Sequence, residues 1–222
     1  MDRNVAYKVF TFEEYGSQER LSVTIPEVLD PRFGMYVWPC AVVLAQYIWT
    51  HRQDLMDCTV LELGAGVALP GLVAARCGSR VILSDNSNSP DCLKNCLNSC
   101  VANGLEEVVT VGLTWGEVSP DLLQLPPVDL VLGSDVFYEP EDFEDVLLTV
   151  AFLLRKNPSA QFWTTFQERS ADWSLETLLH RWNLQCFNVP LETFHADSSE
   201  LAGSQLPGRH NIQMMIIKPM TS

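Results

Sequence analysis

Glycines and acids follow two apolar runs of this chain at spacings that suit a nucleotide-like ligand. In VLELGAGVALPG, residues 60–71, the run ends at Glu62 and is followed by Gly64 and Gly66. In RVILSD, residues 80–85, the run ends at Asp85, about 20 positions after Gly64, where dinucleotide-binding proteins place an acid for the ribose hydroxyls. Three interpretations are open: a phosphate cradle, a different nucleotide pocket, or a tight strand-to-helix turn without a ligand.

A phosphate cradle fits this loop poorly. The third glycine position of the dinucleotide fingerprint is Leu69, and Gly71 comes too late. The carboxylate of Glu62 would also repel a pyrophosphate unless it points away. S-adenosylmethionine, which has a ribose, a flat base and positive charge, suits the loop better. Its ribose suits Asp85, its adenine suits the aromatic face of Trp115, and its ammonium and sulfonium groups suit an acidic loop lined by carbonyl groups.

A second acidic segment follows a later apolar run. VDLVLGSD, residues 128–135, ends at Asp135, and Tyr138 and Glu139 come shortly after it. Methyl transfer is an in-line attack on a methyl group that the sulfonium charge already activates, so catalysis consists of positioning the nucleophile and removing its proton. Asp135 can accept hydrogen bonds from a cationic side chain, and Tyr138 can pack over that cation. We predict that Asp135, Tyr138 and Glu139 are the catalytic residues.

The elements that carry these residues alternate between strand and helix. Such alternation indicates a parallel sheet covered by helices on both faces. Ligands of such sheets bind at the carboxyl ends of the strands, so we expect Gly64, Asp85, Trp115 and Asp135 to line one pocket. The expected strands are residues 59–64, 80–85, 108–113, 128–135 and 161–166, and the expected helices are residues 39–51, 70–77, 90–102 and 140–154.

The two ends of the chain depart from this alternation. At the start, VAYKVFTF and LSVTI flank a polar turn and predict an N-terminal hairpin. Near the end, residues 184–189 and 211–218 are expected strands joined by a polar loop without a helix, so they should pair antiparallel. We predict a hairpin extension over residues 1–30 and one α/β domain over residues 31–222, with no linker between them.

Five motifs occur in an order that resembles the small seven-strand class I methyltransferases, in particular the methyltransferase-like proteins that modify lysine or arginine in other proteins. They are VWP at residues 37–39, LELGAG at 61–66, LSD at 83–85, TWG at 114–116 and SDVFY at 134–138. The resemblance covers the chain from about Gly34 onward. It implies a Rossmann-like, mostly parallel sheet of seven strands with helices on both faces and an antiparallel C-terminal hairpin.

The resemblance also assigns residues to the site. It implies that the methyl donor, S-adenosylmethionine, is lined by Trp38, the loop Gly64-Ala65-Gly66, Asp85, Trp115 and Ser134, and we add Glu62 and Asn86 to this cofactor site. It further implies that the Asp-x-x-aromatic pattern positions the substrate. One position differs: where the family often has a third glycine, this chain has Ala68, so we expect a bulkier loop near the methionine end of the cofactor.

The net charge of −14 favours basic partners and disfavours nucleic acid. An acidic surface also improves solubility, so the charge alone does not identify a partner. Acids concentrate after Tyr138, where they either attract a basic peptide or complement the N-terminal end of the helix that Pro140 opens, and for Glu141 and Asp142 we prefer the helix explanation. The resemblance implies a basic protein substrate with histone as the substrate class. Chaperones or transcription factors are candidate partners if the chain acts by docking.

The cysteines and histidines give no metal or disulfide pattern. Cys92, Cys96 and Cys100 repeat every four residues on an expected helix, which suits core packing better than an iron–sulfur loop. The four histidines show no ligand spacing. His195 and His210 flank a late loop that could border the substrate mouth, but we prefer solvation at the surface for both. Without a visible secretory signal or membrane span, we expect no membrane role and a reducing compartment. A nuclear location besides the cytoplasm rests on the resemblance.

Several functions remain open on the sequence. The leading hypothesis is an S-adenosylmethionine-dependent protein N-methyltransferase, without a metal, that acts on a basic side chain, and the resemblance favours arginine. Lysine in a non-histone protein is the alternative acceptor, because Asp135 and Tyr138 match a pattern that lysine-modifying relatives share. A binding module that keeps the cofactor fold without catalysis, and methyl transfer to a small molecule, are further alternatives.

Overall fold

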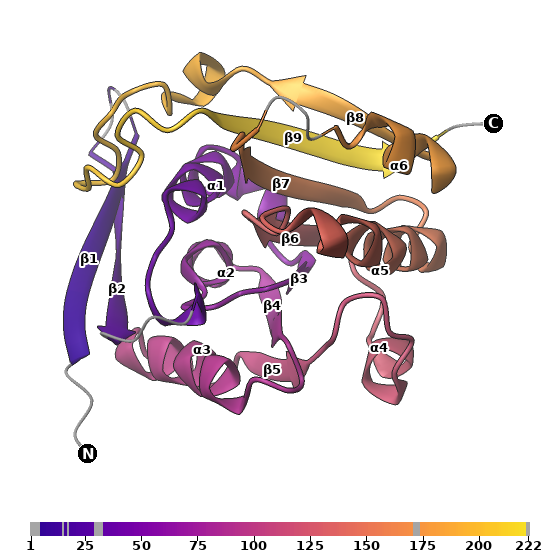
Figure 1. Ribbon diagram of the computed structural model, residues 1–222. Coiled ribbons are helices and arrows are strands. Elements are labelled where there is room, and N and C mark those ends of the chain that lie inside the picture. Colours follow the sequence, from indigo (N-terminus) through magenta and orange to yellow (C-terminus); the bar gives the residue numbers. More distant parts are fainter. Residues whose placement is uncertain (1–4, 15, 17, 29–32, 171–173, 221–222) are drawn as a thin grey trace.

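The computed structural model describes residues 5–14, 16, 18–28, 33–170 and 174–220. A twisted seven-stranded sheet in the order β5-β4-β3-β6-β7-β9-β8 forms its centre, and a separate two-stranded sheet, β1-β2, lies beside it (Figure 1). The strands are β1 Val5–Glu13, β2 Arg20–Val28, β3 Thr59–Glu62, β4 Arg80–Asp85, β5 Val109–Gly112, β6 Leu130–Ser134, β7 Gln161–Gln167, β8 Leu184–Val189 and β9 Ile212–Pro219.

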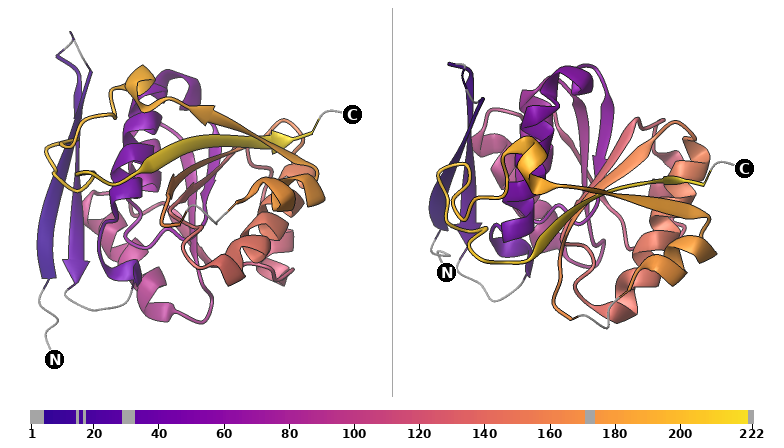
Figure 2. Two further views of the ribbon diagram at one scale, coloured as in Figure 1. Left: turned by 45° about the horizontal axis from the view of Figure 1, so that its top comes forward. Right: turned by 90° about the horizontal axis from the view of Figure 1, so that it is seen from above.

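Helices cover both faces of the large sheet. The α-helices are α1 Pro39–Thr50, α2 Leu69–Arg76, α3 Pro90–Ala102, α4 Pro120–Gln124, α5 Phe143–Lys156 and α6 Glu176–Arg181, and the 3₁₀ turns are η1 Phe33–Met35, η2 Arg52–Leu55, η3 Pro140–Asp142 and η4 Leu191–Phe194. Figure 2 shows α1 on one side of the sheet and α5 and α6 on the other. Each side has its own apolar core, so the sheet is buried on both faces.

The fold confirms the predicted Rossmann-like α/β class with its mostly parallel seven-stranded sheet. Strands β3 to β7 pair parallel, whereas β9 pairs antiparallel with both β7 and β8. The predicted antiparallel C-terminal hairpin is therefore present. Its later strand, β9, lies next to the parallel strands, and its earlier strand, β8, is the sheet edge. Strand pattern alone does not determine this order, because either strand of the hairpin could join the sheet.

Two short helices were missing from the sequence expectations. Helix α4 begins after Ser119, whose hydroxyl accepts a hydrogen bond from Leu122 N (3.2 Å), and Pro120 occupies its first turn. Helix α6 precedes β8. The helix expected from Pro140 is also divided: η3 comes first, and the regular helix starts at Phe143. None of the described helices is long and apolar enough to span a bilayer.

The predicted N-terminal hairpin packs onto the α/β domain and shares its core. Its inner face carries Phe10, Phe12 and Val23, which are at most 1% exposed and pack in the core that contains α1 and α2. The side chain of Asn103 at the end of α3 accepts from Thr24 N (2.9 Å) and donates to Thr24 O (2.7 Å). The hairpin thus lacks a core of its own. The predicted boundary at residues 30 and 31 lies outside the described residues.

Because the hairpin and the sheet share one core, we predict that Phe12→Ala lowers the free energy of unfolding of the whole protein by about 3–5 kcal/mol within one cooperative transition. Urea unfolding followed by fluorescence and circular dichroism measures it. Tyr7→Ala is the matched control, because Tyr7 on the same strand is 68% exposed and its loss should change stability little. Two separate transitions, with the main one unshifted, would contradict a shared core.

Candidate active site

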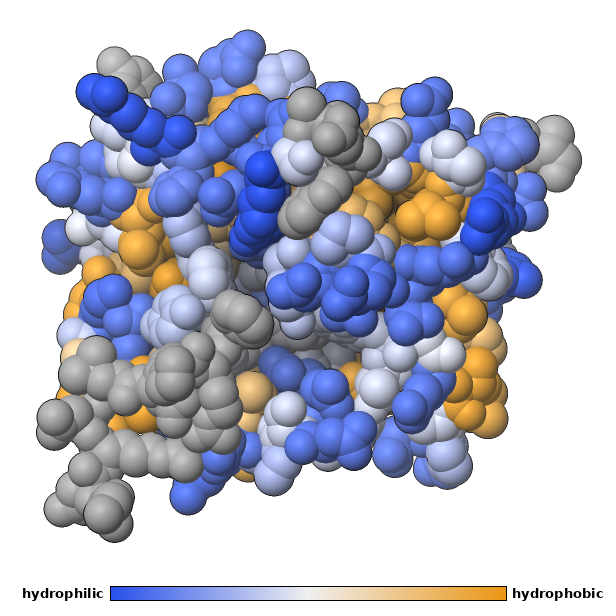
Figure 3. Space-filling view, viewed as in Figure 1, coloured by the Kyte–Doolittle hydropathy of each residue, from blue (hydrophilic) through white to orange (hydrophobic). Residues whose placement is uncertain are grey.

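A cavity of about 1000 Å³ opens at the carboxyl ends of β3, β4 and β6. The face seen in Figure 3 is hollowed near its middle, among mostly hydrophilic residues. Every predicted site residue except Glu62 lines this cavity. They are Trp38, Gly64, Ala65, Gly66, Asp85, Asn86, Trp115, Ser134, Asp135, Tyr138 and Glu139.

The glycine loop brings its backbone against the cavity. Gly64 and Gly66 have φ values of 60° and 55°, in the left-handed region that favours glycine. A Cβ atom on Gly64 would lie 2.8 Å from the Trp115 ring, which is closer than such atoms pack. The indole therefore lies directly over the loop backbone, and this site requires glycine for both conformation and space.

Ala68 differs from the expectation. Its side chain is fully buried and does not line the cavity, so the loop is not bulkier on the cofactor side. Ala68 instead precedes α2 with a φ of 62°, which an alanine adopts at some cost in strain. Any effect of replacing the family's glycine here acts through the backbone.

Glu62 also differs from the prediction that it contacts the cofactor. It is fully buried behind the loop, where its Oε2 accepts from Gly71 N in the first turn of α2 (2.9 Å). The apolar surroundings of Glu62 leave Oε1 without a partner among the described residues, and burial raises the pKa of the carboxyl group to about 8. The sequence does place this acid at a strand end. Whether its side chain faces the cavity or the helix depends on packing of α2 onto the sheet.

Asp85 joins the loop to the next strand. Its Oδ2 accepts from Gly66 N and its Oδ1 from Asn86 N, both at 2.8 Å. Burial raises the pKa of this carboxyl group, and the two backbone N–H groups act in the opposite direction. Each carboxylate oxygen has a second lone pair. Since Asp85 lines the cavity, these remaining acceptors can bind a pair of ligand hydroxyls.

Two aromatic pairs form further walls of the cavity. The Trp115 and Tyr138 rings meet edge to face with centroids 6.4 Å apart, and the Tyr36 and Trp38 rings are tilted with centroids 5.0 Å apart. Aromatic faces bind flat bases and cations. Burial, followed by the charges of Asp142 and other acids, raises the pKa of Tyr138, so its phenol stays protonated and can donate a hydrogen bond.

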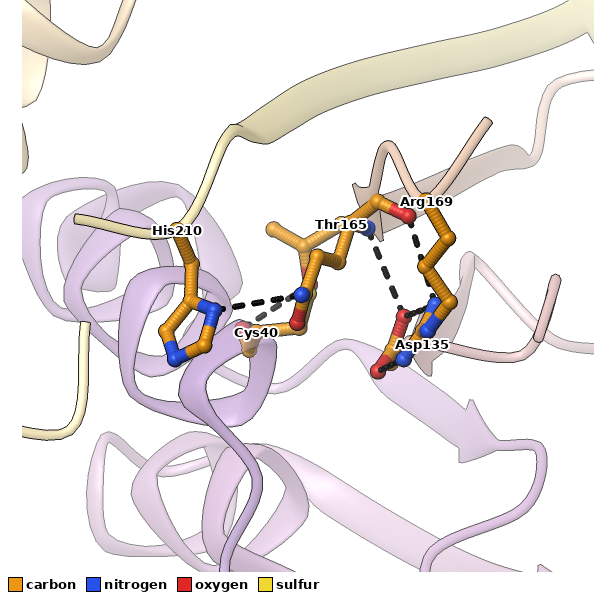
Figure 4. Close-up of polar contacts among 6 residues, drawn as sticks. Cys40, Asp135, Thr165, Arg169 and His210 are labelled. Atoms are coloured by element: carbon orange, nitrogen blue, oxygen red, sulfur yellow. Dashed lines mark hydrogen bonds and ion pairs between the residues drawn. The ribbon is translucent and has the colours of Figure 1, made fainter. Parts of the chain in front are cut away.

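Asp135 already has a cationic partner within the protein. It is 7% exposed, and its carboxylate forms a bidentate ion pair with Arg169, at 2.9 Å to Nη1 and 2.5 Å to Nη2 (Figure 4). Gln167 N lies 3.4 Å from Asp135 Oδ1. The backbone of Asp135 has a φ of 55°, and its N–H bonds to Thr165 O at 2.8 Å. The carboxylate that we predicted for a substrate cation is therefore already paired with a cation of the protein itself.

Sequence reasoning missed Arg169, although a signal exists. Residues 128–135 and 161–166 were both expected as strands of one parallel sheet, and the structure pairs Ser134 with Thr165. Residues just beyond the ends of two such strands lie close together. Arg169 is the first basic residue after the second strand, so a pairing with Asp135 would have been a reasonable expectation if the two strands had been placed side by side.

More acids line the cavity than we predicted. Asp142 and Asp145 join Glu139 there, whereas Glu141 is exposed and does not line the cavity. The helix explanation fits Glu141 but is incomplete for Asp142, which lines the cavity and makes no side-chain cap bond. Among the described lining residues, Arg169 is the single base. The cavity thus has an excess of negative charge.

The cysteine helix packs in the core as expected. Cys92, Cys96 and Cys100 are at most 9% exposed, and Cys96 Sγ donates to Gly66 O at 3.1 Å. Cys92 also lines the cavity and lies so close to Gly34 that a Cβ there would be 2.6 Å from its sulfur. Within the described part of the chain, no group of three or more His, Cys, Asp and Glu residues could hold a metal ion.

The buried Glu62 predicts a specific pH dependence of stability. The folded protein keeps the Glu62 proton up to about pH 8, whereas the unfolded chain loses it near pH 4.5. The free energy of unfolding should therefore fall as the pH rises between these values, by up to about 1.4 kcal/mol per pH unit from this group. Glu62→Gln cannot ionise and should lose this decline. Urea unfolding of both proteins from pH 5 to 9 measures it, and parallel pH profiles would contradict an ionisable buried Glu62.

Comparison with known proteins identifies the family. A family model described as lysine methyltransferase matches residues 17–177. Histone-arginine methyltransferase METTL23 of Xenopus laevis is 62% identical over 97% of this chain and 93% of its own length. The protein of the same name from Homo sapiens is 59% identical over 82% of this chain and 96% of its own length. Protein N-lysine methyltransferase METTL21A of Mus musculus is 36% identical over 54% of this chain and 56% of its own length.

Solved structures share the fold at low sequence identity. A SAM-dependent methyltransferase from Agrobacterium tumefaciens aligns with a TM-score of 0.60 and 15% identity, over 90% of this chain and 68% of that one. A ribosomal protein L11 methylase from Lactobacillus delbrueckii subsp. bulgaricus aligns with a TM-score of 0.56 and 14% identity, over 80% and 77%. With the family model covering most of the chain, these findings show that the protein belongs to the lysine methyltransferase family of class I S-adenosylmethionine-dependent protein methyltransferases.

Proposed function

We propose that this methyltransferase acts on arginine side chains of histones. The observation that carries the proposal is the excess of carboxylates in the cavity, which is lined by Asp135, Glu139, Asp142 and Asp145, whereas Arg169 is the single base among the described lining residues. A guanidinium group keeps its charge at any ordinary pH, so an acidic site is needed to bind it. The names of the relatives that are 57–62% identical to this chain support the same acceptor.

The residues present fit S-adenosylmethionine. Asp85 offers acceptors for the ribose hydroxyls, and the close approach of Gly64 to Trp115 leaves a flat wall for the adenine. Trp38, Ala65, Gly66, Asn86 and Ser134 line the same cavity and complete the proposed cofactor site. Glu62 supports it from behind through Gly71. When bound, the cofactor supplies a methyl group that its sulfonium charge activates.

At the acceptor end, we assign different roles to the acids. Glu139 is exposed and lines the cavity, so it can hold the incoming guanidinium group and take its proton as the new bond forms. Asp135 is bound to Arg169 and acts as a positioning residue for that side chain. Tyr138 packs beside the acceptor and keeps its phenolic proton.

Lysine is the second candidate acceptor, because the family model and the METTL21A relatives carry that description. The charges of the cavity argue against it. A lysine amine attacks only when it is neutral, and nearby carboxylates raise the pKa of an amine and keep it protonated. Arginine does not face this difficulty, since its proton can leave to a carboxylate during the reaction.

If histones are the acceptor, some of the protein molecules must be in the nucleus, and we propose that the protein occurs in both the nucleus and the cytoplasm. The acidic net charge suits a basic protein partner and disfavours direct contact with nucleic acid. Docking to chaperones or transcription factors would be a separate activity that needs no methyl transfer.

Methyl transfer into purified histones tests the proposal. With labelled cofactor and amino-acid analysis, we expect label in methylarginine. Glu139→Gln should lower kcat roughly 10²- to 10⁴-fold, the usual contribution of a general base, with unchanged cofactor affinity. Glu141→Gln is the matched control, because Glu141 is exposed nearby but does not line the cavity. Label found only in methyllysine would show that the acceptor is lysine and not arginine. Full activity of Glu139→Gln would contradict the assignment of Glu139 as the general base.

Calorimetry with S-adenosylmethionine tests the cofactor site separately. Asp85→Asn should lose about 1.5–3 kcal/mol of binding free energy, the usual value of hydrogen bonds to a charged group. This loss corresponds to a roughly 10- to 100-fold weaker Kd. Asp121→Asn, in the first turn of α4 and away from the cavity lining, should bind like the wild type. Equal affinity of Asp85→Asn and the wild type would contradict the assignment of Asp85.

A further inference from the structure

A second cavity, of about 610 Å³, lies between the hairpin and the end of β7. Three parts of the chain that are far apart in sequence form its walls. The hairpin contributes Ala6, Lys8, Glu27 and Val28, the segment before α1 contributes Tyr36 to Pro39, and the other side consists of Gln167, Arg169, Leu206 and His210. None of these residues was predicted to form a site except Trp38.

Hydrogen bonds hold the walls of this second cavity in place. Glu27 is buried, and its carboxylate accepts from Val37 N (2.8 Å) and from Lys8 Nζ (2.7 Å), which joins the hairpin to the segment before α1. Gln167 Nε2 and His210 Nδ1 lie 3.1 Å apart (Figure 4). This contact joins β7 to the late loop, residues 190–211, which connects β8 to β9. His210 is exposed, as expected, and it also lines this cavity. These contacts fix the positions of the walls relative to one another.

The second cavity meets the first. Tyr36, Val37, Trp38 and Arg169 line both of them. The junction is therefore bounded by the tilted aromatic pair and by the ion pair of Arg169 with Asp135. A cationic side chain that crosses this junction passes aromatic faces, which attract cations, and arrives among the carboxylates of the first cavity.

The charges of the two cavities differ. In the second cavity Lys8 is paired with Glu27, and Arg169 is paired with Asp135, so the lining has little unbalanced charge. The first cavity has excess acid. Apolar side chains such as Val28 and Leu206, together with Gln167 and His210, suit a polypeptide backbone with its alternating donors and acceptors better than a charged group.

We propose that the second cavity binds the stretch of acceptor polypeptide next to the methylated residue, while the basic side chain of that residue reaches through the junction into the first cavity. This inference rests on the proposed function, a protein acceptor with a basic side chain. In this proposal the hairpin and the late loop contact the residues that flank the methylated residue and so select the acceptor.

The extent of the family match agrees with this division. The lining of the first cavity lies entirely between residues 34 and 169, within the matched residues 17–177. Ala6, Lys8, Leu206 and His210 of the second cavity lie outside the match. The shared chemistry thus uses the common part of the chain, and acceptor selection would use the parts that the family model does not include.

Filling the second cavity tests the proposal. Ala6→Trp places a large ring into the cavity from β1, and Leu206→Trp does so from the opposite wall. Val5→Trp is the matched control, since Val5 is the neighbouring residue of β1, is 45% exposed and does not line the cavity. For each protein we would measure the melting temperature, the Kd of S-adenosylmethionine by calorimetry, and labelled-methyl transfer into histones and into whole-cell lysate at several acceptor concentrations.

We expect at least one filling variant to fold, to bind the cofactor like the wild type, and to show a KM for the protein acceptor raised by roughly tenfold or more, equivalent to about 1.4 kcal/mol. Val5→Trp should keep the wild-type KM. Folded filling variants with the wild-type KM would overturn the inference. If the wild type labels a lysate protein but no histone, the histone proposal fails, and the same comparison on that labelled protein still decides the inference. If the wild type labels neither, both fail.

Discussion

Two carboxylates at the ends of adjacent strands hold the loop on which the whole site depends. Glu62 at the end of β3 binds Gly71 N, and Asp85 at the end of β4 binds Gly66 N. The Ser84 hydroxyl donates a hydrogen bond to Glu62 O (2.7 Å), and Ser84 O accepts one from Ala65 N (2.9 Å). The loop backbone thus has a defined position relative to the sheet, and a backbone that approaches a ligand closely needs such fixation.

The same sheet also positions the wall of the first cavity that contains Asp135 and Arg169. The pairing of β6 with β7 brings Asp135 beside Arg169, and their ion pair stands at the junction of the two cavities. The buried Glu27 then attaches the hairpin to the segment that carries Tyr36 and Trp38. A structural element that looks like an appendage in the sequence therefore lines the second cavity, and its apolar face packs in the main core.

Periodicity and the alternation of strands with helices were the features from which the sequence could be interpreted correctly. Alternating strands and helices identified the fold, and the rule that ligands bind at the carboxyl ends of parallel strands placed Gly64, Asp85 and Trp115 on one cavity. Sequence reasoning failed for the direction of individual side chains at those ends. Glu62 points to a helix, because α2 packs over it, and Asp135 points to Arg169, because the strand register brings the two together. The second cavity was beyond reach, since its walls come from segments more than a hundred residues apart.

The excess of acid in the first cavity also bears on turnover. S-adenosylmethionine carries a positive sulfonium, and its product S-adenosylhomocysteine does not, so the carboxylates attract the fresh cofactor more strongly than the spent one. The excess of acid therefore contributes to a preference of the cavity for the cofactor over its product. Because part of this attraction acts through solvent, its strength decreases with ionic strength.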